Sequence, residues 1–393
     1  MPEKIIYLDS NDYSALSKTH LSESEAQVRS TLLALKASGD AVFAFSGAHI
    51  SEMAPMDQPY ADAAIRRTGL LKDLCERNAM ISFDRLIKAE LESLVAQRSD
   101  RIQVMDANGQ WFPELGALVS PLDSLDISGT LDKQAQDASL NRKGRRALRA
   151  TTLSKSGNFR SNLGHLGKPN LDEFLETFPM RPQDAQVLHN FVMGKASRKK
   201  ADEALLESLR DPTYMAQWFR EHHHKLGAIG EWVRRPAQNL ITTMETNFEK
   251  LRTVLTRMPA DERATTLGSF NNSFWVKAQN EGILDIVNQL LSTWLPDAPP
   301  CKDISIVDEY CPGLSTCLRG LYSSVRNSFG TGTRVMKHSD FVDVIHALYV
   351  PYVSFFRADA YMASILQPLA KRFGTQVHSS TSSLIKALEA PQP

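Results

Sequence analysis

The residues in this sequence with the clearest chemical potential are acids that follow short apolar runs. Asp9 follows the run at residues 5–8, and Asp359 follows the run at 352–356. Glu52 lies in a predicted helix directly after a third apolar run, at 41–45. In an open parallel sheet, sites form outside the carboxyl ends of the strands. We therefore expect these three carboxylates to lie at one edge of a sheet.

A further group of chemically active side chains lies in the predicted helix 339–349. Asp340, Asp343 and His346 are spaced three residues apart there, so they share one face of the helix. Carboxylates packed together repel one another, which makes a bound cation or a raised pKa necessary. A ligand set made only of oxygen atoms suits Mg²⁺ or Mn²⁺. Such an ion can bind a phosphate oxygen and activate water.

Strands and helices alternate in the first part of the chain. The apolar runs at 5–8 and 41–45 predict strands, and residues 80–83 predict a short third one. Helical spacing of apolar residues covers 23–38, 46–54 and 60–78, and Asp12 is expected to cap a short helix after the first strand. This order predicts a mostly parallel sheet with helices on both faces.

The middle of the chain has a different character. Strand-like runs are nearly missing from residues 96–300, where helical patterns dominate. After that, a helix at 315–329, the helix at 339–349, strands at 352–356 and 375–379, and a closing helix restore the alternating pattern. We predict an α/β domain formed by residues 1–95 and 301–393, interrupted by a large all-α insertion at 96–300.

Three segments together resemble the PIN-domain ribonucleases. They are YLDSNDYSAL with Asp9, HISEMAP with Glu52, and DFVDVIHALYVPYVSFFRAD with Asp343 and Asp359. The family has an Asp at the end of its first strand, a Glu on the helix after its second strand, an Asp at the start of a later helix, and an Asp at a later strand end. Asp343 precedes VIHALY in register with the family pattern, and Asp340 is the reserve for that position.

The resemblance implies a three-layer α/β/α fold and a hydrolase, a metal-dependent endonuclease acting on RNA. Asp9, Glu52, Asp343 and Asp359 would be the catalytic residues that hold Mg²⁺ or Mn²⁺, with Asp340 as a further ligand. A metal-bound water would cleave the phosphodiester and leave a 5′-phosphate and a 3′-hydroxyl. Many members are toxins of toxin–antitoxin pairs or RNA-processing and defence nucleases, so a protein antitoxin or complex partner would accompany the RNA.

Several further side chains are candidates for substrate binding. Asn11, His346 and Arg357 lie next to the proposed acids in the sequence, and Arg357 stands where the family has Thr or Ser. Turn chemistry explains Asn11 about as well, and a structural role explains His346 about as well. Glu90, within a predicted helix at 86–94, is expected on a solvated helix face, and a role as an outer-shell acid is the alternative.

A strongly basic segment lies within the predicted insertion. Residues 142–168 contain no acid, and their cations include Arg142, Lys143, Arg145 and Arg146. The chain as a whole has 45 Lys and Arg and 45 Asp and Glu residues, so this is local segregation of charge. Phosphate backbones attract such clusters. Substrate binding is one interpretation, and a solvated basic loop is the other.

Bulk composition limits the remaining classes. Hydrophobic residues make up 42% and charged residues 23%, which is typical of globular proteins, and no apolar run is long enough to span a membrane. The 4 cysteines are too few for a disulfide scaffold, and we expect a cytoplasmic protein with reduced thiols. The alternatives to an RNase are a catalytically idle PIN-like binding or scaffold module and a nuclease acting on DNA. The oligomeric state, homo-oligomers included, stays open.

Overall fold

The structure is a computed structural model of the whole chain. It describes residues 4–53, 61–98, 102–112, 140–152, 180–192, 195–214, 246, 249–250, 253–268, 273–330 and 344–390. The chain forms two compact units, and each is described by itself. The sheet unit comprises residues 1–53, 69–113 and 233–393, and the helical unit comprises 54–68 and 114–232. The predicted division at residues 95 and 300 remains a prediction.

A four-stranded parallel sheet lies at the centre of the sheet unit. Its strands are β1 (Ile5–Tyr7), β2 (Val42–Ala44), β5 (Phe355–Arg357) and β6 (Gln376–His378), in the order β2-β1-β5-β6. Ile6 pairs in register with Phe43 on one side and with Phe355 on the other. Strands buried on both faces are expected to be continuously apolar, as β1 and β2 are, whereas β5 ends in an arginine and β6 has the sequence QVH. The predicted α/β fold with a parallel sheet is therefore confirmed, whereas its three-layer form stays a prediction.

A second, two-stranded sheet adjoins the first. Strand β3 (Ala79–Met80) pairs antiparallel with β4 (Met105–Asp106), and a single parallel bridge joins Ala79 to Phe45 just beyond β2. The short strand predicted at 80–83 thus begins one residue earlier. Its antiparallel partner lies in a stretch where the sequence predicted helices.

Helices follow β1 and β2 as the sequence predicted. They are α1 (Ser10–Leu16), α2 (Glu23–Ser38), α3 (Gly47–Met53), α4 (Ala61–Cys75) and α5 (Phe83–Ala96). The expected cap of the first helix is wrong by one turn. Asp9 is the N-cap of α1, and Asp12 completes a capping box by accepting a hydrogen bond from the Asp9 backbone amide.

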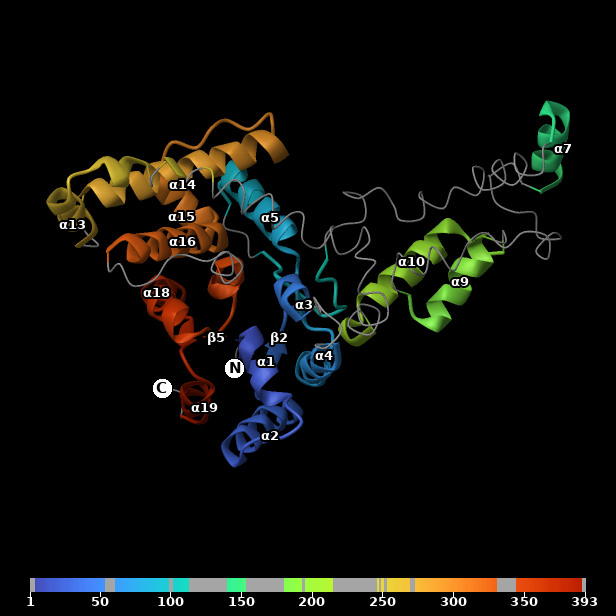
Figure 1. The fold of residues 1–393 in the computed structure, drawn as a ribbon, viewed down its shortest axis with the longest axis horizontal. Helices are drawn as coiled ribbons and strands as arrows, with labels where there is room; N and C mark the ends of the chain where they lie inside the picture. The colour runs from blue at the N-terminus through green and yellow to red at the C-terminus, as the bar shows by residue number, and fades with distance from the viewer. Residues whose placement is uncertain are drawn as a thin grey trace. The chain divides into compact units, whose positions relative to one another are not determined.

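The C-terminal part of the chain returns to the sheet. Its elements are α15 (Ile304–Tyr310), α16 (Pro312–Gly330), the 3₁₀-helices η5 (Ala347–Tyr352) and η6 (Lys371–Phe373), α18 (Ala360–Ala370) and α19 (Thr381–Glu389). Helix α18 packs on β6 and α16, while α19 packs on β5, β6 and α2; Figure 1 shows α19 beside α2. These helices therefore pack on the part of the sheet formed by β5 and β6.

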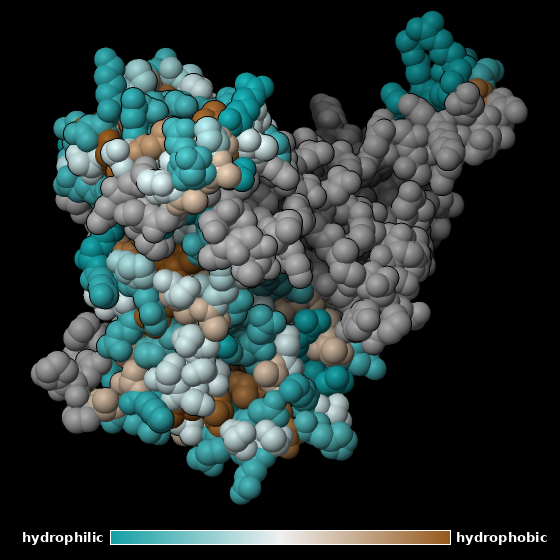
Figure 2. Space-filling view, turned by 60° about the vertical axis from the view of Figure 1, so that its left-hand side comes forward, coloured by the Kyte–Doolittle hydropathy of each residue, from teal (hydrophilic) through white to brown (hydrophobic). Residues whose placement is uncertain are grey.

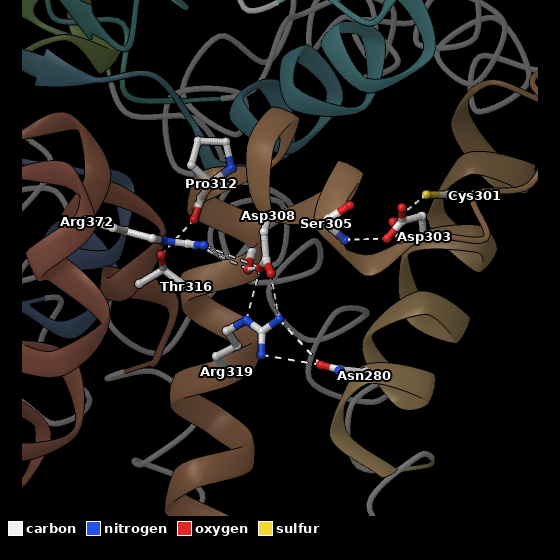
Figure 3. Close-up of polar contacts among 10 residues, drawn as sticks. Asn280, Cys301, Asp303, Ser305, Asp308, Pro312, Thr316, Arg319 and Arg372 are labelled. Carbon is white, nitrogen blue, oxygen red and sulfur yellow. Dashed lines mark hydrogen bonds and ion pairs between the residues drawn. The ribbon is translucent and has the colours of Figure 1, made fainter. Parts of the chain in front are cut away.

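Helices from the predicted insertion also belong to the sheet unit. They are α13 (Ala260–Gly268) and α14 (Ser273–Trp294), and α14 packs on α15 and α16. The carboxylate of Asp308 connects several of these helices. Asp308 on α15 binds the Arg319 guanidinium through two hydrogen bonds of 3.0 and 2.8 Å, and Arg319 also reaches Asn280 on α14 (Figure 3).

The charge of Asp308 is well compensated. Arg372, from η6, lies 3.5 Å from the same carboxylate, and Ser315 donates a hydrogen bond to it. Burial alone would raise the pKa of Asp308, but the hydrogen bonds from Arg319 and Ser315 and the two cations hold it below its usual value. This ionic network therefore joins α14, α15, α16 and η6.

The described residues of the helical unit include a pair of packed helices and a basic helix. Helices α9 (Pro182–Val192) and α10 (Arg198–Leu209) bury Leu188 and Leu205 against each other, and Asp184 accepts hydrogen bonds from Arg181 and Ser208. Helix α7 (Arg142–Thr152) contains the basic residues singled out from the sequence. Across the described ranges, every helix is too short or too polar to cross a bilayer.

Candidate functional site

Three of the predicted acids follow neighbouring strands of the parallel sheet. Asp9 lies two residues beyond β1, Asp359 lies two residues beyond β5, and β1 pairs directly with β5. Glu52 lies on α3, which follows β2 on the other side of β1. The sheet topology therefore places Asp9, Glu52 and Asp359 at the carboxyl edge, as expected for sites in such sheets. Asp340 and Asp343 lie outside the described residues.

Glu52 is the most strongly engaged of these acids. His346 Nε2 lies 3.1 Å from Glu52 Oε2, and the Ser10 hydroxyl donates a hydrogen bond to the same oxygen. Burial alone would raise the pKa of Glu52, but His346 and Ser10 outweigh it and lower the pKa to about 2. Glu52 is therefore ionised at neutral pH, and its carboxylate faces Ser10, the residue directly after Asp9.

A chain of buried polar groups extends from His346 into the core. His346 Nδ1 lies 2.6 Å from the Tyr7 hydroxyl, and that hydroxyl lies 2.6 Å from the Ser46 hydroxyl. Tyr7 and Ser46 are fully buried. Sequence reasoning did not select either residue, although a tyrosine in an otherwise aliphatic strand and a serine at the end of a second strand are available signals. Together these groups fix the orientation of the imidazole that binds Glu52.

The neighbouring histidine, His49, completes this network as a neutral side chain. The Ser46 backbone N–H can only donate, so it donates a hydrogen bond of 3.1 Å to His49 Nδ1, and this imidazole nitrogen is the acceptor. His49 Nε2 must then carry the proton, which it donates to the Leu8 carbonyl at 2.9 Å. Burial is the main cause that lowers the pKa of His49 to about 3, and nearby His346 lowers it further. His49 thus connects the ends of β1 and β2 structurally.

The neutral state of His49 predicts a specific pH dependence of stability. Its pKa is about 3 in the folded chain and about 6.5 in the unfolded chain, so the unfolded chain binds more protons between these values. Stability is therefore lost as the pH falls below about 6.5. Replacing His49 with glutamine removes this dependence, and the destabilisation caused by the substitution is expected to shrink by about 2 kcal/mol between pH 7 and pH 5.

Urea unfolding of both proteins at the two pH values measures this difference. Exposed His20 provides the control, because His20→Gln makes the same substitution at the surface and leaves buried His49 in place. An equal loss of stability in wild type and His49→Gln on acidification would mean that His49 does not stay neutral in the folded chain.

Asp9 and its surroundings form a second polar group at the edge. Asp9 accepts a hydrogen bond of 2.7 Å from the Asn11 backbone amide, while Asn11 itself is exposed. Arg357 Nη2 lies 3.1 Å from Asp12 Oδ1, and both side chains are largely buried. Burial raises the pKa of Asp12 to about 7, although Arg357 opposes this rise. The Arg357 charge, predicted to face substrate, lies against Asp12 in this structure.

Asp359 also has a structural partner. It is the N-cap of α18 and accepts a hydrogen bond of 2.7 Å from the Met362 backbone amide. Within the described part of the chain, no three His, Cys, Asp or Glu side chains gather closely enough to hold a metal ion. The described acids therefore share an edge and the right donor chemistry, but they do not form a closed ligand set by themselves.

The predicted basic residues lie in a different unit. Arg142, Lys143, Arg145 and Arg146 are exposed on α7 of the helical unit. Their role in substrate binding remains a prediction. Comparison with known proteins adds nothing to these observations: no family model, no curated protein and no solved structure matches the chain.

Proposed function

We propose that this chain is a metal-dependent endoribonuclease with a PIN-like α/β domain. One observation carries the proposal: β2, β1 and β5 are parallel neighbours, and each is followed at its carboxyl end by one of the predicted acids. These acids come from positions as far apart as Asp9 and Asp359 in the sequence. Such convergence at the edge where α/β enzymes bind their ligands supports a catalytic role.

The donor chemistry of this edge suits a hard divalent cation. Glu52 is ionised, and carboxylate oxygens are the ligands that Mg²⁺ and Mn²⁺ prefer. Asp9, Glu52, Asp359 and Asp343 would hold the ion, with Asp340 as a further ligand. When bound, the ion would supply a Lewis acid for the phosphodiester and a water of lowered pKa. His346 would keep the Glu52 carboxylate oriented, and Asn11 would contact the substrate. Arg357 would contact the substrate only on release from Asp12, which it binds in this structure.

The proposed setting is the cytoplasm. All of Cys75, Cys301, Cys311 and Cys317 are buried free thiols, which supports a reducing compartment. RNA is the proposed substrate, and a protein antitoxin or complex partner would regulate access to the site. Nothing in this proposal depends on the oligomeric state.

Removal of the metal tests the proposed function directly. The purified chain is expected to cleave a mixed-sequence RNA in Mn²⁺ or Mg²⁺, to stop in excess EDTA, and to recover when Mn²⁺ is added back in excess. Products with a 5′-phosphate are expected, and a DNA strand of the same sequence is expected to stay intact. Cleavage that continues in EDTA, or its absence in both metals, would overturn the proposal.

A second candidate is a PIN-like module that binds partners without catalysis. It is favoured by the protein partners of Asp9, Glu52 and Asp359, each of which is satisfied without a metal. Thermal unfolding with increasing Mn²⁺ separates the two candidates. For a binding module, the unfolding temperature should rise no more in Mn²⁺ than in Ca²⁺. For the nuclease, the unfolding temperature should rise with Mn²⁺ concentration in the way expected for binding at a specific site.

A further inference from the structure

Helix α7 is unusual because it carries only positive charges. Arg142, Lys143, Arg145, Arg146 and Arg149 are all exposed, and the helix RKGRRALRATT contains no acid. Figure 2 shows this helix as a strongly hydrophilic segment at the upper right. Its start is well formed, because Asn141 Oδ1 accepts a hydrogen bond of 2.9 Å from the Gly144 amide. The helix therefore has a local N-terminal cap, and its side chains carry a high density of positive charge.

The spacing of these cations opposes the helix that carries them. Arg142 has like-charged neighbours at three and four residues, Arg145 and Arg146, and Arg149 repeats this pattern at the other end. Like charges at these spacings each destabilise a helix by about 0.2–0.5 kcal/mol, and cations near the N-terminus oppose the helix dipole. A polyanion bound along α7 would remove this repulsion.

Helix α10 of the same unit shows the ordinary arrangement of basic residues. Arg198 lies 3.7 Å from Asp202, and Lys199 lies 3.9 Å from Glu203, each one turn further along. Those cations are compensated within their own helix. Helix α7 itself contains no acid, so its exposed cations form a positive surface that attracts a polyanion.

The shape of α7 indicates which polyanion fits. A helix that binds a membrane surface presents a continuous apolar face with large side chains. On α7 the Arg and Lys residues share one face, and on the opposite face Leu148 is the one large apolar side chain, beside Gly144, Ala147 and Thr151. We propose that α7 binds the phosphate backbone of a nucleic acid, with the RNA substrate as its ligand. The choice of RNA rests on the proposed function.

The contacts expected are electrostatic and independent of sequence. Guanidinium groups match the oxygens of a phosphate, and each neutralised phosphate releases a counterion. For single strands log K falls as log salt rises, with a slope of about −0.7 per phosphate contact, so fewer contacts make the slope less steep. Loss of three such contacts should therefore make the slope less steep by about 2.

A charge-matched pair of full-length variants tests this inference. The first carries Arg142→Gln, Arg145→Gln and Arg146→Gln, and the control carries Arg198→Gln, Lys199→Gln and Lys200→Gln. Binding of a labelled single-stranded RNA is measured by fluorescence anisotropy in EDTA between 50 and 200 mM salt. We expect the α7 variant to bind about tenfold or more weakly at 100 mM salt, with a slope less steep by about 2, and the control to bind within about twofold of wild type.

Three outcomes decide against the inference. They are wild-type affinity in the α7 variant, an equal loss in both variants, and a loss of binding to vesicles containing anionic lipid with RNA binding unchanged. A DNA strand of the same sequence should lose affinity in parallel, because the contacts are to phosphate. Since the assay contains no metal, α7-dependent binding can hold even if cleavage is never observed. Conversely, metal-dependent cleavage with normal RNA binding by the α7 variant would remove this inference and leave the proposed function standing.

Discussion

Asp9→Asn is expected to abolish metal-dependent RNA cleavage while leaving the fold intact. Asparagine is as good an N-cap as aspartate, so its Oδ1 can still accept the hydrogen bond that the Asn11 amide makes at 2.7 Å. What disappears is one negative charge at the carboxyl edge of β1. Metal ions contribute several kcal/mol to catalysis, so loss of a ligand should lower the rate in Mn²⁺ at least about a hundredfold.

Two other aspartates that cap helices serve as comparisons for this prediction. Asp359 caps α18 at the same edge of the sheet, accepting from the Met362 amide, and Asp359→Asn is expected to act like Asp9→Asn. Asp303 caps α15 in the same way, accepting from the Ser305 amide at 2.8 Å, but α15 packs on α5, α14 and α16. Asp303→Asn should therefore cleave RNA like wild type.

Thermal unfolding of all three variants in EDTA provides the check on folding. Each should unfold near the wild-type temperature, because each keeps its cap. Wild-type cleavage by a folded Asp9→Asn protein would show that this carboxylate is not a ligand, and the proposed nuclease site would have to be abandoned. Equal losses in Asp303→Asn would instead trace the defect to helix capping.

The parallel sheet could be predicted because its strands carry a strong local signal. The runs at 5–8 and 41–45 are continuously apolar, the run at 352–356 is apolar except for Ser354, and each is followed by a polar residue. Strand β4 carries no such signal, since it has only two residues, Met105 and Asp106, and forms through pairing with β3. Near residue 350 the sequence predicted helix and then strand, where the structure has the 3₁₀-helix η5, with Pro351 in its last turn. Tertiary packing decides such short elements.

The site, too, could be predicted only in part. Its edge could be predicted, because strand ends and parallel topology fix where Asp9, Glu52 and Asp359 lie. Its partners could not, because they depend on side-chain directions across long separations in sequence. His346 meets Glu52 across 294 positions and Tyr7 across 339 positions. Tyr7 stands out in its otherwise aliphatic strand, but no local pattern indicates that its hydroxyl will meet the imidazole of His346.

Glu90 shows the largest difference between the sequence-based expectation and the structure. The sequence placed it on a solvated helix face, which is wrong: Glu90 on α5 is fully buried. Its carboxylate accepts hydrogen bonds from the amides of Gly313 and Leu314, at 2.6 and 2.9 Å, and from the Tyr352 hydroxyl. It therefore caps the start of α16 from another helix, 223 residues away in sequence.

The backbone at the start of α16 packs closely against the Glu90 carboxylate. A Cβ atom added at Gly313 would lie 2.7 Å from Glu90 Oε1 and 2.5 Å from the Leu348 carbonyl oxygen. Burial raises the pKa of Glu90 to about 7 even though all three hydrogen bonds oppose the rise, so the site is poorly solvated. Water is not expected to replace the carboxylate if it is removed.

Glu90→Ala is accordingly expected to destabilise the protein by roughly 4 kcal/mol or more. The substitution leaves two buried amides and a hydroxyl without an acceptor, each costing about 1–3 kcal/mol, and adds the cost of a cavity. Glu92 on the same helix is the matched control: its side chain is 55% exposed, and Lys88 lies 3.9 Å away. Glu92→Ala should change stability by no more than about 0.5 kcal/mol.

Chemical unfolding followed by circular dichroism measures both variants, and Tyr352→Phe separates the contributions at Glu90. That variant removes one donor while keeping the ring and the acceptor of both amides, so it should cost only about 1 kcal/mol. If Glu90→Ala failed to fold, Tyr352→Phe and Glu90→Gln would still report on the cap, with the glutamine variant intermediate because one of its two terminal atoms no longer accepts. Comparable losses from Glu90→Ala and Glu92→Ala would contradict the assignment, since only the buried carboxylate joins α5 to the start of α16.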